Sequence, residues 1–410
     1  MVLLNSAAIL MTLAALFAYF NHRFVRLPTT IGIMLISLCL SLLILAAGEL
    51  GFIDVRPYVD WLARDIDFYT TLMHGMLSFL LFAGALHVNL NDLHRQKLVI
   101  ALLATIGVLL STGIIGAVSY MVLMALGLKI PLIYCLLFGA LISPTDPIAV
   151  MGILKTSTAP KSLHTKIAGE SLFNDGVGVV VFLVLLGIAT GGEHLDVMKI
   201  GSLFVQEAIG GAVFGLVLGY VAYVLLKGVN NYQVEVMLTL ALVMGGYALA
   251  NYVHLSGVIA MVVAGLMIGN QGRVLAMSDQ TRDHLDTFWE LIDEILNAVL
   301  FVLLGLEIVI LAYKLEYVLA ALAIIPLVLF ARFVSVGLPV LLLKRFRTFT
   351  PNVIKIMTWG GLRGGISVAL ALSLPAGEHR EIILAITYAV VLFSILVQGM
   401  SIGPLLSDRR

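Results

Sequence analysis

Long apolar stretches separated by short polar ones run along the whole chain. A helix needs about 20 apolar residues to cross a bilayer, and windows of nearly that length or more lie near 3–20, 31–50, 69–90, 98–127, 131–154, 167–190, 200–226, 235–252, 256–270, 292–312, 316–343, 353–374 and 382–406. The pattern predicts an all-α polytopic membrane protein with about thirteen transmembrane helices. Twelve or fourteen also fit, because 256–270 is short and two other windows are long.

The composition fits that class and excludes others. With 61% hydrophobic residues, 12% charged residues and a mean hydropathy of +1.08, the chain lies outside the range of soluble globular domains. The formal net charge is zero, so nothing favours a nucleic-acid partner. The chain has no His-Glu-x-x-His metal pair and no serine in a plausible catalytic triad. We therefore expect no enzyme and no cofactor.

Basic residues collect in alternate loops. With the N-terminus placed outside, sixteen lie on the inside, six on the outside, and Arg332 and Arg363 lie within windows. The inside set is Arg23, Arg26, Arg95, Lys97, Lys155, Lys161, Lys166, Lys227, Arg273, Arg282, Lys344, Arg345, Arg347, Lys355, Arg409 and Arg410, and the outside set is Arg56, Arg64, Lys129, Lys199, Lys314 and Arg380. Cytoplasmic loops are enriched in Lys and Arg, so we expect an outside N-terminus and a cytoplasmic C-terminus. The inside segment 271–290 is polar, and its acids are spaced like the outer face of a short helix.

A proline-rich break interrupts the fifth window at Ser143-Pro144-Thr145-Asp146-Pro147. Pro144 and Pro147 each remove a backbone donor and disfavour helical geometry in the residue before them, so the helix is expected to unwind. Irregular backbone at membrane depth is tolerated only inside protein or beside water. Freed carbonyls together with the Asp146 carboxylate make a hard, oxygen-rich cation site.

A second polar stretch, 170–176, lies one window later and is expected to stay helical. Glu170 and Asn174 are four residues apart, as are Ser171 and Asp175, so the four side chains form one broad polar face. Ionised groups at this depth are costly and usually functional. Because of the neighbouring acids, Asp175 is expected to exchange a proton for the cation.

A third polar interruption places Arg363 among the glycines of 360–365, in the twelfth window. Of the membrane-embedded acids, Glu170 is its predicted partner, because pairing with Asp146 or Asp175 would occupy the cation site. Arg332 is a second embedded cation that either lines the site or extends toward the inside surface. Breaks in corresponding positions of two halves indicate an inverted repeat, as in transporters whose substrate site lies where discontinuous helices meet.

Four motifs together resemble the bacterial sodium/proton antiporters of the monovalent cation/proton antiporter superfamily, in the branch that includes the animal sodium/hydrogen exchangers. They are Ser143-Pro-Thr-Asp146-Pro, Glu170-Ser-Leu-Phe-Asn174-Asp175-Gly, the segment from Leu296-Asn297 to Gly305-Leu-Glu307, and Gly361-Leu-Arg363-Gly-Gly. The likeness covers nearly the whole chain. It implies electroneutral exchange of one Na⁺ or Li⁺ per H⁺ by alternating access, serving pH and sodium homeostasis. A K⁺/H⁺ antiporter and, as another class, a cation channel are the alternatives.

The resemblance also implies how the chain is divided. A moving core comprises about 98–190 and 316–406 and holds the two crossing broken helices. A dimerisation domain comprises about 3–90 and 235–312, and a helix at about 200–226 links the two. The protein is expected to be a homodimer in the bilayer of the bacterial inner membrane.

For the site, the resemblance implies Na⁺ ligands from the Asp146 and Asp175 carboxylates, the Ser171 hydroxyl and the Thr145 carbonyl. Asn174 would hold the broken helices together, with Pro144 and Pro147 shaping the break and Glu170 paired with Arg363. Asn297 and Arg332 are additional candidates. One position departs from many relatives: Ala83 stands where a glutamate is frequent, so no carboxylate is expected from that helix.

Overall fold

The computed structural model describes residues 2–52, 54, 57, 61, 66–155, 160–191, 205–275, 277–311 and 314–407. Within these residues the chain is almost entirely helical and contains no strand. Each of the thirteen apolar windows coincides wholly or mostly with helix. The all-α prediction is therefore confirmed, and the number of spans is compatible with thirteen.

Nine helices in the described residues are long and apolar enough to cross a membrane, and Leu132–Ile142 and Gly257–Gly272 are shorter apolar helices. Several spans combine an α-helix with a wider π turn. In chain order the elements are α1 Val2–Phe20 with η1 Asn21–Val25, α2 Thr29–Glu49, α4 Phe68–Thr70, η2 Thr71–Met76, α5 Leu77–Leu86, α6 Leu90–Leu102, η3 Leu103–Gly107, α7 Val108–Ala125, α8 Leu132–Ile142, α9 Ile148–Lys155, α10 Lys161–Gly191, η4 Gln206–Gly210, α12 Gly211–Lys227, α13 Tyr232–Tyr252, α14 Gly257–Met267, η5 Ile268–Gly272, α15 Arg273–Leu275, α16 Asp279–Leu306, η6 Glu307–Ile310, α17 Leu315–Leu343, α18 Val353–Trp359, α19 Gly365–Leu372, α20 Glu378–Phe393, η7 Ser394–Gln398 and α21 Gly399–Ser407.

The helical spacing expected in the polar segment 271–290 is present, but in a helix that is longer than expected. Residues from Asp279 onward are the first turns of α16, which continues unbroken to Leu306. The Ser278 hydroxyl accepts a hydrogen bond from Thr281 N and so caps the helix start. Helix α16 therefore begins among polar residues and enters the apolar region without a break.

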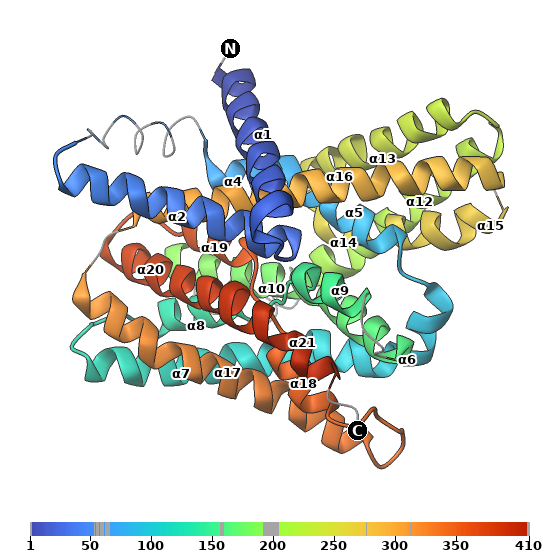
Figure 1. Cartoon of the computed structure of the whole chain (residues 1–410). Helices are drawn as coiled ribbons and strands as arrows, with labels where there is room; N and C mark the ends of the chain where they lie inside the picture. Colours follow the sequence, from blue (N-terminus) through green and yellow to red (C-terminus); the bar gives the residue numbers. More distant parts are fainter. Residues whose placement is uncertain are drawn as a thin grey trace.

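The helices form two groups of close neighbours with α10 between them. In one group α7, α8, α17 and α20 pack together, and in the other α2 packs on α16 while α14 packs on α5, α12 and α13. Helix α10 contacts α8 and α6 on one side and α14 on the other, and it runs through the middle of the molecule (Figure 1). Its central position places the polar residues 170–176 inside the bundle.

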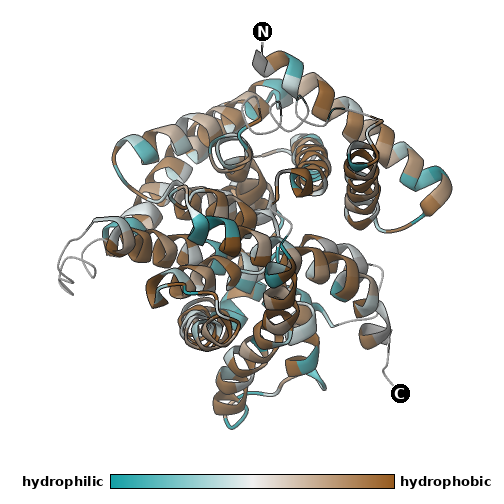
Figure 2. Cartoon of the chain, turned by 90° about the vertical axis from the view of Figure 1, so that its left-hand side faces the viewer, coloured by the Kyte–Doolittle hydropathy of each residue, from teal (hydrophilic) through white to brown (hydrophobic). Residues whose placement is uncertain are grey.

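The outer surface is apolar, as a lipid environment requires. Hydrophobic residues make up most of the length of the helices (Figure 2). On α12, for example, Val213, Leu216 and Tyr220 are all more than half exposed. Soluble monomers rarely expose large apolar surfaces. The chain is therefore a membrane protein with several apolar helices.

Candidate ion-binding site

Two broken helices cross at the centre of the molecule. Helix α8 ends at Ile142 and α9 begins at Ile148, while α18 ends at Trp359 and α19 begins at Gly365. The segments between them meet directly, because Asp146 N donates a hydrogen bond to Leu362 O at 2.8 Å. The predicted pair of crossing discontinuous helices is thus confirmed.

Local chemistry accounts for the first break. Pro144 and Pro147 provide no N–H to continue the helix, and the Ser143 hydroxyl turns back to donate to Gly139 O at 2.6 Å. Beyond the break, the Asp146 carboxylate accepts from Ile148 N at 2.9 Å and so helps to start α9. Asp146 is thereby fixed in the unwound stretch between two half-helices.

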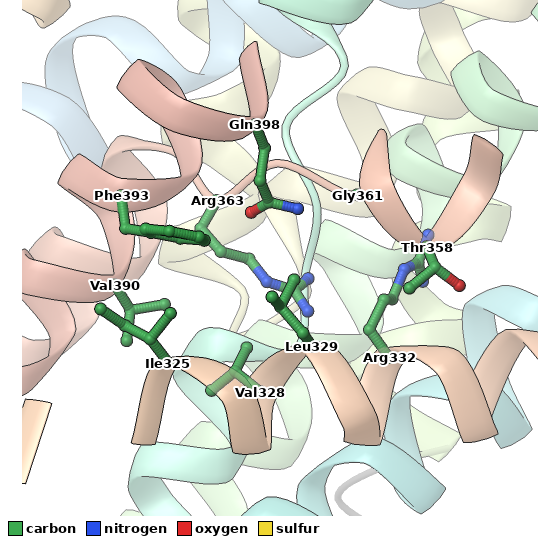
Figure 3. Close-up of a pocket in the computed structure, with 10 residues that line it drawn as sticks. All are labelled: Ile325, Val328, Leu329, Arg332, Thr358, Gly361, Arg363, Val390, Phe393 and Gln398. Carbon is green, nitrogen blue, oxygen red and sulfur yellow. The ribbon is translucent and has the colours of Figure 1, made fainter. Parts of the chain in front are cut away.

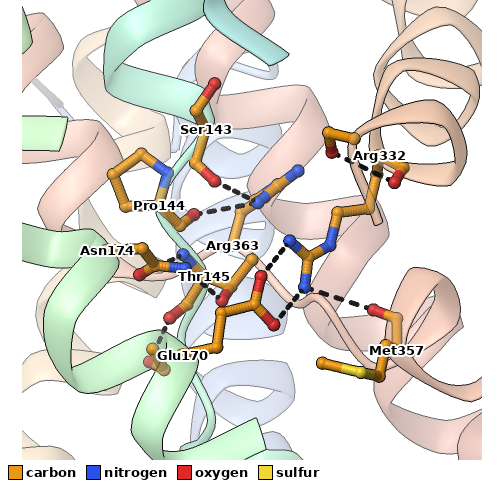
Figure 4. A network of polar contacts seen from close by, with 10 residues as sticks. Ser143, Pro144, Thr145, Glu170, Asn174, Arg332, Met357 and Arg363 are labelled. Carbon is orange, nitrogen blue, oxygen red and sulfur yellow. Dashed lines mark hydrogen bonds and ion pairs between the residues drawn. The ribbon is translucent and has the colours of Figure 1, made fainter. Parts of the chain in front are cut away.

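Helix α10 supplies side chains that hold the unwound stretch. Asn174 bonds Thr145 twice: its Oδ1 accepts from Thr145 N at 3.3 Å, and its Nδ2 donates to Thr145 Oγ1 at 2.9 Å (Figure 4). The Ser171 hydroxyl donates to Thr145 O. Asn174 and Ser171 are at most 1% exposed, so these bonds are shielded from water. The structure therefore brings the polar face of α10 and the proline break together.

Asp146 and Asp175 lie near each other beside this contact. Asp175 is 9% exposed, Asp146 is partly buried, and the two carboxylates are close enough to repel. Among the described residues, neither forms an ion pair with a lysine or arginine. The result is a buried region rich in oxygen atoms with two carboxylates available to a cation.

The predicted ion pair between Glu170 and Arg363 is wrong. Glu170 is bound instead by Arg332 on α17, whose Nη1 lies 2.5 Å from Glu170 Oε1 and whose Nη2 lies 2.9 Å from Oε2 (Figure 4). Arg332 Nη2 also donates to Met357 O at 3.3 Å. This two-point geometry matches the planar guanidinium to the carboxylate. Arg332 therefore neutralises the acid next to the site, which is compatible with the prediction that it lines the site and not with extension toward the inside surface.

Arg363 binds carbonyl groups instead. Its Nη1 donates to Ser143 O at 2.8 Å and to Pro144 O at 2.9 Å, and its backbone N donates to Ser394 Oγ at 2.9 Å. The last carbonyls of a helix have no partner within it and carry partial negative charge. Arg363 thus satisfies the end of α8 and places a positive charge beside the break that holds Asp146.

Two glycines of the second break make room for charged side chains. A Cβ on Gly361 would lie 2.5 Å from Arg332 Nε, and a Cβ on Gly364 would overlap the Asp146 carboxylate. Gly364 has φ −119° and ψ −164°, an extended conformation open to any residue. Close approach, not backbone strain, therefore requires glycine there.

Three further buried polar residues lie on α16 and η7. Asn297, on α16, is 2% exposed, its Oδ1 has no hydrogen-bond partner among the described residues, and no described contact joins it to the site. Sequence reasoning missed Ser394 and Gln398, which bond to Arg363 N and to Trp359 O. Both are polar residues within the apolar window 382–406, and this was the available signal.

A membrane bundle in which two broken helices cross beside paired carboxylates defines a secondary ion transporter. The comparison with family models gives the particular family: the model described as "Sodium/hydrogen exchanger, transmembrane" matches residues 11–408. The chain belongs to this family.

Named relatives agree with the assignment. The chain is 56% identical to the Na⁺/H⁺ antiporter NhaP of Pseudomonas aeruginosa, over 98% of this chain and 96% of the relative. It is 35% identical to the Na⁺/H⁺ antiporter NhaH of Halobacillus aidingensis, over 94% and 92% of the two chains. Among solved structures, the sodium proton antiporter MjNhaP1 of Methanocaldococcus jannaschii at pH 8 has the same fold, with a TM-score of 0.77, 20% identity, and coverage of 98% of this chain and 97% of that one.

Proposed function

We propose that this protein is a secondary active antiporter that exchanges Na⁺ or Li⁺ for H⁺ by alternating access, for pH and sodium homeostasis. The observation that carries the proposal is the juxtaposition of Asp146 and Asp175 where the two breaks cross. Membership of the sodium/hydrogen exchanger family and relatives named as Na⁺/H⁺ antiporters support it. These names favour Na⁺/H⁺ exchange over K⁺/H⁺ exchange.

The proposed ligands are the carboxylates of Asp146 and Asp175, the hydroxyl of Ser171 and the carbonyl of Thr145. All are oxygen donors, as a hard monovalent cation requires. Ser171 already contacts Thr145 O, so the two donors are held in one place. In the described residues no group of three or more His, Cys, Asp or Glu could hold a metal ion. Two carboxylates suit a small monovalent cation that must be released in every cycle.

Coupling follows if Na⁺ and H⁺ use the same carboxylates in turn. Asp175 is the proposed proton carrier, because it is buried beside another acid and has no cationic partner in the described residues. Protons then compete with Na⁺, so low pH should raise the apparent Michaelis constant for Na⁺. At high pH too few protons remain for the return step, and the rate profile should be bell-shaped.

The charges near the site favour electroneutral exchange of one Na⁺ per H⁺. Glu170 and Arg332 cancel each other, and Asn174 carries no charge. The fixed charge of Arg363 offsets one of the two carboxylates. One bound Na⁺ or one bound proton offsets the other, so the core is neutral in both loaded states. A neutral core crosses a membrane potential without electrical work.

The packing supports a division into a moving core of about 98–190 and 316–406 and a dimerisation domain of about 3–90 and 235–312. Helices α7, α8, α10, α17 and α20 pack within the first set, and α2, α5, α14 and α16 within the second. Helix α12, the proposed link, packs on α14, and η4 just before it contacts α10. Homodimerisation through the second set completes the proposal.

The topology proposed from the charged loops places the N-terminus outside the bacterial inner membrane and the C-terminus in the cytoplasm. The start of α10 should therefore face the cytoplasm, and its first residue, Lys161, is exposed. A single cysteine replacing Lys161 should react with an impermeant maleimide in inside-out vesicles and stay unlabelled in intact cells. Labelling from outside alone would invert this topology.

The function is tested in proteoliposomes that contain a pH-sensitive dye and carry an acid-inside gradient. Na⁺ and Li⁺ added outside should draw protons out and dequench the dye, K⁺ should do so weakly or not at all, and Asp175→Asn protein should give no signal. A K⁺ response equal to that of Na⁺ would assign the protein to K⁺/H⁺ exchange. Cation uptake that cannot drive protons against their concentration gradient would show that the protein is a cation channel.

A further inference from the structure

A small cavity lies beside the second break, between α17, α18, α20 and η7. Its polar lining residues are Arg332, Thr358, Arg363 and Gln398, and its apolar ones are Ile325, Val328, Leu329, Val390 and Phe393, with Gly361 at the edge (Figure 3). The volume within which the centre of a water molecule can lie is about 10 Å³. That is close to the space that one water molecule needs.

Arg363 presents unused hydrogen-bond donors to this cavity. A guanidinium has five N–H groups, and the two on Nη1 are used by Ser143 O and Pro144 O. No other described residue accepts a hydrogen bond from Nε or Nη2. The side chain is only 2% exposed, so little bulk water reaches these donors. A buried charged group with unfilled donors costs more than a neutral one.

Gln398 lines the same cavity and offers a matching acceptor. Its Nε2 donates to Trp359 O at 2.9 Å, which fixes the orientation of the amide. Oε1 has no described partner and belongs to a side chain that is 3% exposed. The cavity therefore brings donors from the second break together with an acceptor from η7.

We propose that this cavity holds one structural water that accepts from the Arg363 guanidinium and donates to Gln398 Oε1. A wholly apolar cavity of this size would stay dry, whereas one with two or more polar partners retains water. The water binds the part of the guanidinium, Nε and Nη2, that does not bond to the Ser143 and Pro144 carbonyls. Gln398 is thus a positioning residue for Arg363, and the site is distinct from the ion ligands.

The first test is a cryo-EM map of the protein in nanodiscs, at a resolution where other buried waters are visible. A peak within about 3 Å of both Arg363 and Gln398 Oε1 is expected, and it should be absent from the Gln398→Leu variant. A wild-type map without the peak, or a peak that persists in Gln398→Leu, would overturn the proposal.

The second test uses thermal melting and separates a wet cavity from a dry one. Val328→Leu adds volume at the cavity wall, and Val336→Leu adds the same volume at another buried position of α17 outside the cavity. If Val328→Leu expels the water, it should melt below the Val336→Leu control, by about 2 °C or more. A melting temperature above wild type would show that the added methylene fills empty space, and would overturn the proposal.

Exchanging the anion of the buffer salt tests whether an anion, and not water, occupies the cavity. Replacing chloride with gluconate should leave the wild-type melting temperature unchanged. A chloride-dependent melting temperature that Val328→Leu abolishes would show that an anion occupies the cavity, and would overturn the assignment to water. Neither melting test depends on transport, so neither can fail because the proposed exchange is wrong.

Discussion

The two breaks in the membrane are built in opposite ways. The first, 143–147, is held by polar side chains from α10 and from the second break: Asn174 and Ser171 bind Thr145, and Arg363 binds the carbonyls of Ser143 and Pro144. In the second, 360–364, glycines leave room for the side chains of neighbouring segments. The first break places oxygen ligands close together. The second break leaves space for neighbouring side chains and contributes one positive charge, that of Arg363. Substitutions in the two should therefore fail for different physical reasons.

The largest effect is expected in the second break. Gly364→Ala places a methyl group on the Asp146 carboxylate, although the extended backbone there accepts alanine. Dequenching in proteoliposomes should fall below detection while the protein still folds. Gly403→Ala, on α21 with nothing near its Cβ, is the matched control and should exchange like wild type. Normal exchange by Gly364→Ala would refute the close packing of the two breaks.

The next effect concerns stability at the edge of the site. Glu170→Gln or Arg332→Gln leaves the other charge buried and unpaired, which should cost about 3 to 5 kcal/mol. In thermal melting the double variant should lose much less than the sum of the two losses. A cycle between Glu170 and Arg363 should show weaker coupling, because those side chains do not bond. Stronger coupling with Arg363 would restore the pairing predicted from the sequence.

The smallest effect is expected in the first break. Ser171→Ala removes one proposed Na⁺ ligand and its bond to Thr145 O, a loss of about 1 kcal/mol. The Michaelis constant for Na⁺ should rise about fivefold with little change in maximal rate. The control is Ser335→Ala, since Ser335 is equally buried and also donates to a carbonyl, that of Arg332. A change in maximal rate alone would make Ser171 structural.

The first break could be predicted from sequence because its chemistry is local. Two prolines dictate unwinding between residues 143 and 148, and the spacing of three residues along α10 places Ser171 and Asn174 on one face whatever the tertiary packing. The meeting of this face with Thr145 required only that two consecutive spans pack against each other. Short connections make such neighbours common.

The partners of the two arginines could not be predicted, because they depend on how distant helices are rotated. Arg332 and Glu170 are 162 positions apart, and the sequence does not say which face of α17 points to α10. As the charge argument expected, Arg363 forms no ion pair with Asp146 or Asp175 in the part of the chain that the structure describes. It overlooked that a buried guanidinium can be satisfied by the free carbonyls at a helix end.

The central claim is that one pair of carboxylates binds either Na⁺ or a proton, and binding alone can test it without transport. Purified protein in a weakly buffered detergent solution is titrated with Na⁺ near neutral pH, while a pH indicator reports protons and calorimetry reports binding. We predict the release of about one proton for each Na⁺ bound by wild-type protein, and none by Asp175→Asn. Binding of Na⁺ without proton release, or unchanged release by Asp175→Asn, would contradict a shared site.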